Sequence, residues 1–222
     1  MSEPNITTRN EFHQRYWSYY IILEKDFLAT ERYLAIDSLN FNAYSNEYIK
    51  QYQAICSEID VIAKSFCREI DSSFKGSSIN TYCKCIVDNN PDFASRSIKL
   101  RDKNIQVTPW KDWTYTMVPQ QGGSSRPEAN NPDWWTKYNK IKHSRTTINN
   151  ATGLPYYKLA NQKNVLDSLA ALFQLEMYYY RCLQQIHFSG EPDMPSPQSD
   201  IFEIDNWGNK WIMAGNIGFQ TA

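Results

Sequence analysis

A histidine, an amide and several cations lie close together between residues 131 and 145 of this 222-residue chain. His143 follows Asn139 by four positions and Lys137 by six. A histidine whose pKa lies near neutrality can donate or accept a proton, and a neighbouring cation can stabilise negative charge that develops during a reaction. The types and the spacing of these side chains therefore indicate acid–base chemistry at an anionic group.

A short helix is expected to carry these residues. Asn131 is a suitable N-cap, Pro132 is tolerated in a first helical turn, and the run that follows has neither glycine nor another proline. Residues four apart share one face of a helix, so Asn139 and His143 are expected to be neighbours. The apolar side of this helix would consist of Trp134, Tyr138 and Ile141.

An ordinary structural role is the alternative for each of these residues. A lone histidine near the end of a helix often caps that helix or complements its dipole, as Lys142 and Arg145 can also do. Trp134 and Trp135 have the flat faces needed to stack bases, yet at least one of them is expected to anchor the helix in the core. The pattern alone leaves both interpretations open.

Apolar residues that recur at intervals of three and four predict four more helices. Their approximate bounds are 12–36, 45–73, 78–89 and 161–186. Cap residues begin three of them: Ser45, Ser78 and Asn161. The apolar stripe of the first helix is expected to include Tyr19 and to leave Glu24 outside it. The last helix has a stripe too wide for a helix with one wet face, so it should be the most buried.

The helix at 45–73 could contribute further polar groups to a cleft shared with His143, namely Glu58, Asp60 and Lys64. Asp60 and Lys64 stand four apart in the favourable orientation for an ion pair on a helix surface, which is the preferred interpretation. The two other histidines of the chain, His13 and His187, have no recognisable partners in the sequence.

The middle and the end of the chain change to short β segments. Residues 97–100 and 105–107 alternate around a turn and predict a hairpin, after which a third extended piece follows. Residues 119–131 are expected to form a polar loop. Near the end, residues 201–204 and 211–213 predict a C-terminal hairpin or arm.

The expected architecture is therefore mainly α. A helical bundle over residues 10–189 carries a β-rich insert at about 97–120, and residues 190–222 form a linker and a C-terminal β arm. The length fits one domain with an appendage and is sufficient for a real core.

The composition limits the classes of function. A net charge of −1 gives no overall nucleic-acid signal, so any basic patch must be local. No stretch approaches the length of an apolar membrane span, and the first residues are polar. Five cysteines, an odd number, favour a reduced cytoplasmic protein. Cys83 and Cys85 have no second close pair, so neither a metal nor a cofactor is expected.

The order of these parts resembles the HEPN superfamily, helical-bundle proteins common in prokaryotic defence and toxin–antitoxin systems. The likeness covers roughly residues 10–186 and is sharpest in Tyr138-Asn139-Lys140-Ile141-Lys142-His143, followed after a loop by the run at 164–173. Active members of that family carry an Arg, then four to six residues, then a His, and cleave RNA without a metal, commonly as dimers. This chain departs from the pattern, because it has Lys137 in place of the Arg and because Arg145 follows the histidine.

The resemblance implies a metal-independent endoribonuclease or an RNA-binding protein of a bacterial defence or toxin–antitoxin system. Its partners would be RNA, a second copy of the chain and a cognate antitoxin or other protein. The catalytic residues would be His143, Lys137 and Asn139. The substrate-binding residues would be Arg145, Lys142 and Trp135, with support from Glu58, Asp60 and Lys64. The alternative is a non-catalytic helical module that binds a nucleotide, a nucleic acid or a protein partner.

Overall fold

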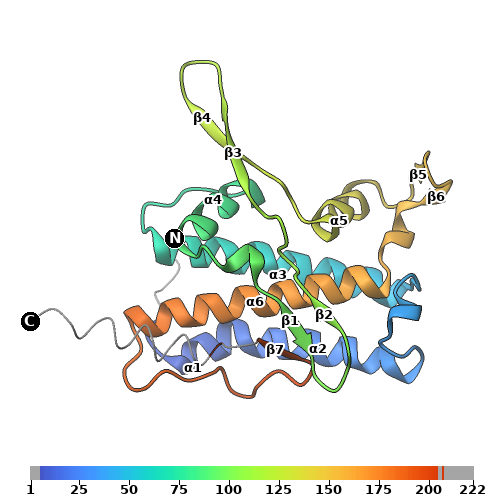
Figure 1. Ribbon diagram of the computed structural model, residues 1–222, viewed down its shortest axis with the longest axis horizontal. Helices are drawn as coiled ribbons and strands as arrows, with labels where there is room; N and C mark the ends of the chain where they lie inside the picture. Colours follow the sequence, from blue (N-terminus) through green and yellow to red (C-terminus); the bar gives the residue numbers. More distant parts are fainter. Residues whose placement is uncertain (1–5, 205–206, 208–222) are drawn as a thin grey trace, which may run out of the picture.

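A computed structural model describes residues 6–204 and residue 207 of the chain (Figure 1). The fold is mainly α, as predicted. The α-helices are α1 (Arg9–Phe12), α2 (Ser18–Ala29), α3 (Asn46–Ile70), α4 (Ile79–Asn89), α5 (Asp133–Ser144) and α6 (Gln162–Ile186). The shorter helical turns are η1 (His13–Trp17), η2 (Thr30–Arg32), η3 (Ser38–Asn40), η4 (Phe93–Ser95) and η5 (Tyr156–Leu159). The strands are β1 (Ile98–Leu100), β2 (Gln106–Val107), β3 (Tyr115–Pro119), β4 (Ser125–Ala129), β5 (Ile148–Asn149), β6 (Leu154–Pro155) and β7 (Phe202–Ile204).

The side-chain caps visible in the sequence begin three of these helices. The Ser45 side chain accepts a hydrogen bond from the Tyr48 amide, and the Asn161 side chain accepts one from the Asn164 amide. Ser78 and Thr81 form a capping box at the start of α4. Each cap satisfies an amide that has no partner inside the helix, which fixes where the helix starts.

The first helix differs from its predicted stripe. Residues 13–17 form a π turn between α1 and α2, and such a turn holds an extra residue that rotates the following side chains around the axis. Tyr19, predicted to be in the stripe, is therefore 39% exposed, whereas Tyr20 is completely buried. Glu24 is also completely buried, and the prediction that it lies outside the stripe is wrong. Its carboxylate accepts hydrogen bonds from the Tyr20 and Ser199 hydroxyls and from the Asp200 amide.

Helix α6 runs through the centre of the molecule, with α3 and α2 beside it (Figure 1). Every residue from 168 to 180 is buried, which confirms that the last helix is the most buried one. Its aromatic side chains pack on both neighbours: Tyr179 contacts Phe66 of α3, and Phe173 contacts Tyr20 of α2. Burial of this apolar surface is the main stabilising contribution to the bundle.

The predicted hairpin at 97–107 is present and gains a third strand from the end of the chain. β1 pairs antiparallel with β2 on one edge and with β7 on the other, and Ile98 is opposite both Val107 and Ile204. Phe202 of β7 is fully buried against Phe173 of α6. The segment at 201–204 therefore pairs with the insert. Its expected hairpin partner at 211–213 lies outside the described residues.

A second hairpin, β3–β4, projects away from the bundle (Figure 1). Tyr115 pairs with Ala129 and Pro119 with Ser125. The predicted loop at 119–131 is thus wrong over Ser125–Ala129, where a strand forms. The Tyr115 hydroxyl donates to the Asp88 carboxylate of α4 at 2.8 Å, which attaches the base of the hairpin to the bundle.

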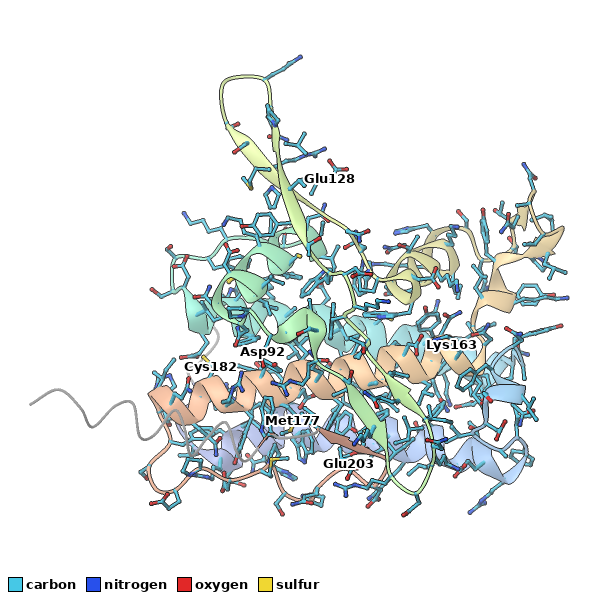
Figure 2. All side chains as sticks on the ribbon, viewed as in Figure 1. Asp92, Glu128, Lys163, Met177, Cys182 and Glu203 are labelled. Atoms are coloured by element: carbon cyan, nitrogen blue, oxygen red, sulfur yellow. The ribbon has the colours of Figure 1, made fainter. Side chains whose placement is uncertain are left out.

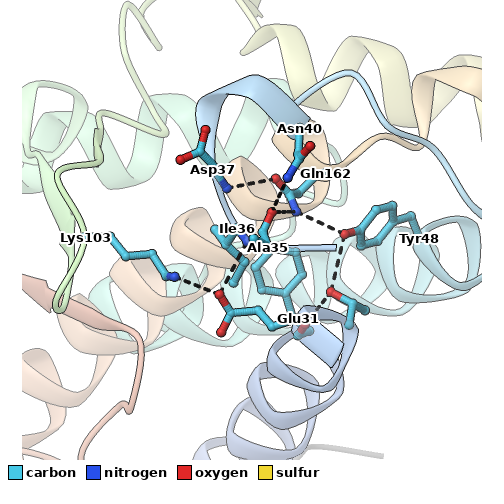
Figure 3. Close-up of polar contacts among 10 residues, drawn as sticks. Glu31, Ala35, Ile36, Asp37, Asn40, Tyr48, Lys103 and Gln162 are labelled. Carbon is cyan, nitrogen blue, oxygen red and sulfur yellow. Dashed lines mark hydrogen bonds and ion pairs between the residues drawn. The ribbon is translucent and has the colours of Figure 1, made fainter. Parts of the chain in front are cut away.

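A buried amide joins the start of α6 to the connection between α2 and α3 (Figure 3). The Gln162 side chain is fully buried and donates to the Ala35 carbonyl at 2.9 Å, while its oxygen accepts from the Asp37 amide at 3.4 Å. Glu31 accepts from Lys103 of the β1–β2 turn at 2.7 Å. These bonds hold one end of the bundle in place next to α5 and η5.

None of the helices in residues 6–204 is long and apolar enough to cross a membrane.

Candidate functional site on helix α5

Helix α5 is fixed to the bundle by its tryptophans and by Tyr52 of α3. The Tyr52 hydroxyl donates to the Trp134 carbonyl, and the Trp134 indole N–H donates to the Pro109 carbonyl at 2.7 Å. Trp134, Tyr138 and Ile141 are buried, as predicted for the apolar side. The helix begins one residue later than expected. Pro132 occupies the N-cap position without a side-chain cap, so the prediction of Asn131 as N-cap is wrong.

Trp135 does not lie on the surface. Its side chain is 7% exposed and packs edge-on against Trp134, with ring centroids 5.8 Å apart, and against Tyr138. A base cannot stack on a ring that is buried. The expectation that Trp135 contacts substrate is therefore replaced by a role in anchoring α5.

His143 lies on the exposed face of α5, in the last turn. Asn139 is four residues before it and Lys140 is three residues before it, so the three side chains share one face of a continuous helix. The imidazole makes no hydrogen bond or ion pair to any residue in the described part of the chain. The structure thus confirms the helix and the neighbouring amide, and it leaves both ring nitrogens open to solvent or to a ligand.

Lys137 belongs to a different group of side chains. Six residues along a helix turn the direction of a side chain by about 120° after whole turns are removed, so Lys137 and His143 point to different sides of α5. The Lys137 ammonium contacts the Asp133 carboxylate at 2.5 Å and the Asn164 side-chain oxygen at 3.5 Å. The expected pairing of Lys137 with His143 is not formed within one chain.

A polar cavity of about 490 Å³ opens beside the start of α5. Lys163 and Asp167 of α6 line it, and these two residues form an ion pair at 2.6 Å. Burial raises the pKa of Asp167, an effect that the charges of Lys163 and Lys137 partly oppose. Asp133 also lines the cavity, and its partner Lys137 links α5 to α6 through the contact with Asn164.

The three supporting residues of α3 do not gather at His143. Gln51 donates to the Asp26 carbonyl of α2, and Ser65 accepts from the Tyr16 hydroxyl of η1. Glu58 stands seven residues from each of them and therefore faces the side of η1 and α2, where Glu176 of α6 also lies. Burial raises the pKa of Glu58 to about 7. Asp60 lies on the α5 side, where its charge contributes to the raised pKa of Tyr138. The predicted ion pair of Asp60 with Lys64 is not formed among the described residues.

His187 has a partner that the sequence did not reveal. Its ring nitrogen Nε2 lies 2.6 Å from the Glu69 carboxylate, so the last residues of α3 and α6 are joined. This contact is at the far end of α6 from α5, and it is structural.

A basic stretch surrounds His143 and extends well beyond α5. From residue 134 to residue 166 the chain has no Asp or Glu and carries six cations: Lys137, Lys140, Lys142, Arg145, Lys158 and Lys163. The chain folds back on itself here, because the Tyr157 amide donates to the Arg145 carbonyl at 2.9 Å. In the described part of the chain, four of these cations lie over aromatic rings: Lys140 over Tyr156, Lys142 over Tyr138, Lys158 over Tyr44 and Lys163 over Phe41.

Four residues of this surface were missed in the sequence, namely Tyr44, Tyr156, Tyr157 and Lys158. Tyr44 is 47% exposed, and its ring lies 6.1 Å from that of Tyr157. Tyr44 reaches the surface from the α2–α3 connection through a bridge to Asn161. The run Tyr156-Tyr157-Lys158 inside an acid-free segment was a visible signal, whereas the arrival of Tyr44 depends on tertiary structure. We call Lys140, Lys142, His143, Arg145, Lys158 and the three tyrosines the basic face.

No family model, curated protein or solved structure matches this chain.

Proposed function

We propose that this chain is a HEPN-like protein that binds single-stranded RNA on the basic face and cleaves it without a metal ion through His143. The observation that carries the proposal is the acid-free stretch of residues 134–166, in a protein whose net charge is −1. It concentrates cations and the partly exposed Tyr156 and Tyr157, which lie next to the exposed Tyr44. A cationic surface with aromatic side chains is the arrangement that tracks a phosphate backbone and stacks bases.

The cations that remain for phosphate are those without a carboxylate partner. Lys137 and Lys163 are paired with Asp133 and Asp167. No ion pair in residues 6–204 involves Lys140, Lys142, Arg145 or Lys158, so an anion could bind to them without breaking an existing ion pair. Each phosphate neutralised releases counterions, which favours association at low salt.

Cleavage would use the exposed side of the last turns of α5. In this proposal His143 accepts the proton of the ribose 2′-hydroxyl or donates one to the leaving oxygen. Asn139 is one turn away and suits a hydrogen bond to the phosphate. Lys140 takes the charge-stabilising role that the family pattern suggested for Lys137, because Lys140 shares the face of His143. As in active members of the family, a homodimer would bring two such faces together.

Binding is tested by fluorescence anisotropy with a labelled single-stranded RNA in EDTA. The variant Lys140→Gln/Lys142→Gln/Arg145→Gln removes three cations of the basic face. Its matched control, Lys25→Gln/Lys75→Gln/Arg126→Gln, removes three exposed cations from α2, the α3–α4 connection and β4. The first variant is expected to lose affinity at least tenfold while the control binds like wild type. Equal binding by both variants would reject the basic face as the RNA surface.

Cleavage is tested with end-labelled RNA in EDTA, comparing wild type with His143→Ala. The expected result is cleavage by wild type and none by the variant, which should still bind RNA because the other cations remain. Equal cleavage by both proteins at matched purity would remove His143 from the mechanism.

The alternative is a non-catalytic module that binds a nucleotide, a nucleic acid or a protein partner. The observation in its favour is that no described residue orients the His143 imidazole, whereas general bases are usually held by a second group. RNA binding without cleavage by any variant would select this alternative.

A further inference from the structure

Three of the five cysteines gather at the end of the bundle opposite the basic face. Cys67 of α3 and Cys85 of α4 lie in the contact between these helices, and Cys182 lies near the end of α6. Figure 2 labels Lys163 and Cys182 towards opposite ends of α6. The cluster is therefore separate from the candidate RNA surface and needs its own explanation.

Two contacts place both sulfur atoms in the same interface. Cys85 Sγ lies 3.8 Å from the Cys67 carbonyl oxygen, and Cys67 Sγ lies 4.0 Å from the Tyr82 carbonyl oxygen. Tyr82 is three residues before Cys85, so it occupies the adjacent turn of the same face of α4. Each thiol also affects the pKa of the other, as expected of neighbouring groups.

The environments of the two thiols are unequal. Cys67 is fully buried, and burial raises its pKa well above the ordinary value. Cys85 is partly exposed, and its hydrogen bond with the Cys67 thiol lowers its pKa, against the opposing effect of burial. A partly exposed thiol whose pKa is lowered, next to a fully buried thiol, is the arrangement of a reactive cysteine and its resolving partner.

Neighbouring cysteines show that this arrangement is specific. Cys83 is two residues from Cys85, so it points to nearly the opposite side of α4, where burial raises its pKa to about 12. Burial also raises the pKa of Cys182 to about 12, with a contribution from Glu69. Metal binding does not account for the cluster, since no group of three His, Cys, Asp or Glu residues within 6–204 could hold a metal ion.

We propose that Cys85 and Cys67 are an oxidative modification site, at which a peroxide converts the two thiols into a reversible disulfide between α4 and α3. In the first step the Cys85 thiolate attacks a peroxide oxygen, the O–O bond breaks, and the products are the Cys85 sulfenic acid and an alcohol or water. In the second step the Cys67 sulfur, after losing its proton, attacks the Cys85 sulfur and releases water. A dithiol reductant reverses the reaction. The proposal is independent of the RNA function.

The test uses the whole reduced protein with hydrogen peroxide. The reaction is stopped with N-ethylmaleimide in denaturant, and peptides are mapped without reduction. The expected result is a cross-linked Cys67–Cys85 peptide that dithiothreitol removes, with Cys56 and Cys83 alkylated as before. A Cys85–Cys182 link, or equal oxidation of all five cysteines, would overturn the assignment.

Variants separate the two roles. Cys85→Ser should abolish the disulfide, and Cys83→Ser, the matched control on the same helix, should leave its rate unchanged. In Cys67→Ser the oxidised Cys85 should persist as a sulfenic acid that dimedone labels. If Cys67→Ser fails to fold, dimedone labelling of wild type at early times gives the same information. Faster dimedone labelling of Cys182 than of Cys85 would reject Cys85 as the peroxide-reactive thiol.

Discussion

Glu58 of α3 lies near Glu176 of α6, and the charge of the Glu58 carboxylate opposes ionisation of Glu176. Glu176 is completely buried, and neither of its oxygens has a hydrogen-bond partner among the described residues. Burial, followed by the effect of Glu58, raises the pKa of Glu176 well above its ordinary value. The surroundings of these two carboxyl groups thus favour their protonated forms over their ionised forms.

The first prediction concerns pH and stability. The pKa of Glu58 rises to about 7 on folding, so its contribution is fully present below its ordinary pKa of 4.5 and is lost as the pH rises through 7. The variant Glu58→Gln should therefore have a free energy of unfolding about 2 kcal/mol higher than wild type at pH 8, after allowance for the partial exposure of Glu58, and should melt at a higher temperature. At pH 4.5 the two proteins should differ little. Circular dichroism melts at the two pH values measure this.

Glu47→Gln is the matched control for that experiment. Glu47 is on the same helix, but its bond with Lys50 lowers its pKa, so the substitution cannot stabilise the protein at pH 8 in the same way. The interpretation fails if Glu58→Gln and wild type keep the same dependence on pH.

The second prediction separates Lys137 from Lys140. Lys140→Gln should reduce RNA cleavage about a hundredfold, because Lys140 shares the face of His143 and charge stabilisation of this kind has that magnitude. Lys137→Gln should retain most of the cleavage and should instead lower the unfolding temperature, since it breaks the link between α5 and α6. Loss of cleavage in Lys137→Gln alone would favour the catalytic role of Lys137 that the family resemblance implies.

The third prediction concerns base stacking on Tyr44. Base–aromatic stacking contributes about 1–3 kcal/mol per base, so Tyr44→Ala should weaken binding of single-stranded RNA by roughly tenfold. Tyr33→Ala is the control, because Tyr33 is on the same connection and is 90% exposed, but no cation of the described residues lies over its ring. Anisotropy titrations that rank the two variants equally would exclude Tyr44 from the RNA surface.

The fourth prediction concerns the buried amide of Gln162. Gln162→Ala removes hydrogen bonds to the Ala35 carbonyl and the Asp37 amide, and loss of buried hydrogen bonds costs about 1–3 kcal/mol (Figure 3). The unfolding temperature should fall by several degrees in a chain of this size. Gln185→Ala, an exposed position on the same helix, should leave it unchanged. Similar melting of the two variants would mean that the amide network adds nothing measurable.

Local sequence signals predicted the helices well. Ser45, Ser78 and Asn161 could be identified because a cap acts on an amide only two or three residues away. The wide apolar stripe of α6 likewise predicted a buried helix, since the period of a helix depends only on neighbouring residues. The position of α5 followed from the same reasoning, apart from one residue at its start.

The remaining features depend on contacts between distant parts of the chain. A π turn changes the face of Tyr19 without any mark in its composition, and the burial of Glu24 depends on Ser199. The separation of Lys137 from His143 follows from the helical period. The contact of Lys137 with Asn164 became visible only in the structure. Tyr44 reaches the basic face through a loop whose shape is set by Gln162.

The pairing of β7 with β1 also sets the order in which the protein can be completed. Ile98 pairs with Ile204, which the ribosome adds about a hundred residues later, so the third strand of the sheet cannot form while the middle of the chain is being made. Until then one edge of β1 is unpaired, and the surface of Phe173 that Phe202 covers is exposed to solvent. The newly made bundle is thus most prone to aggregate in the interval before β7 is added.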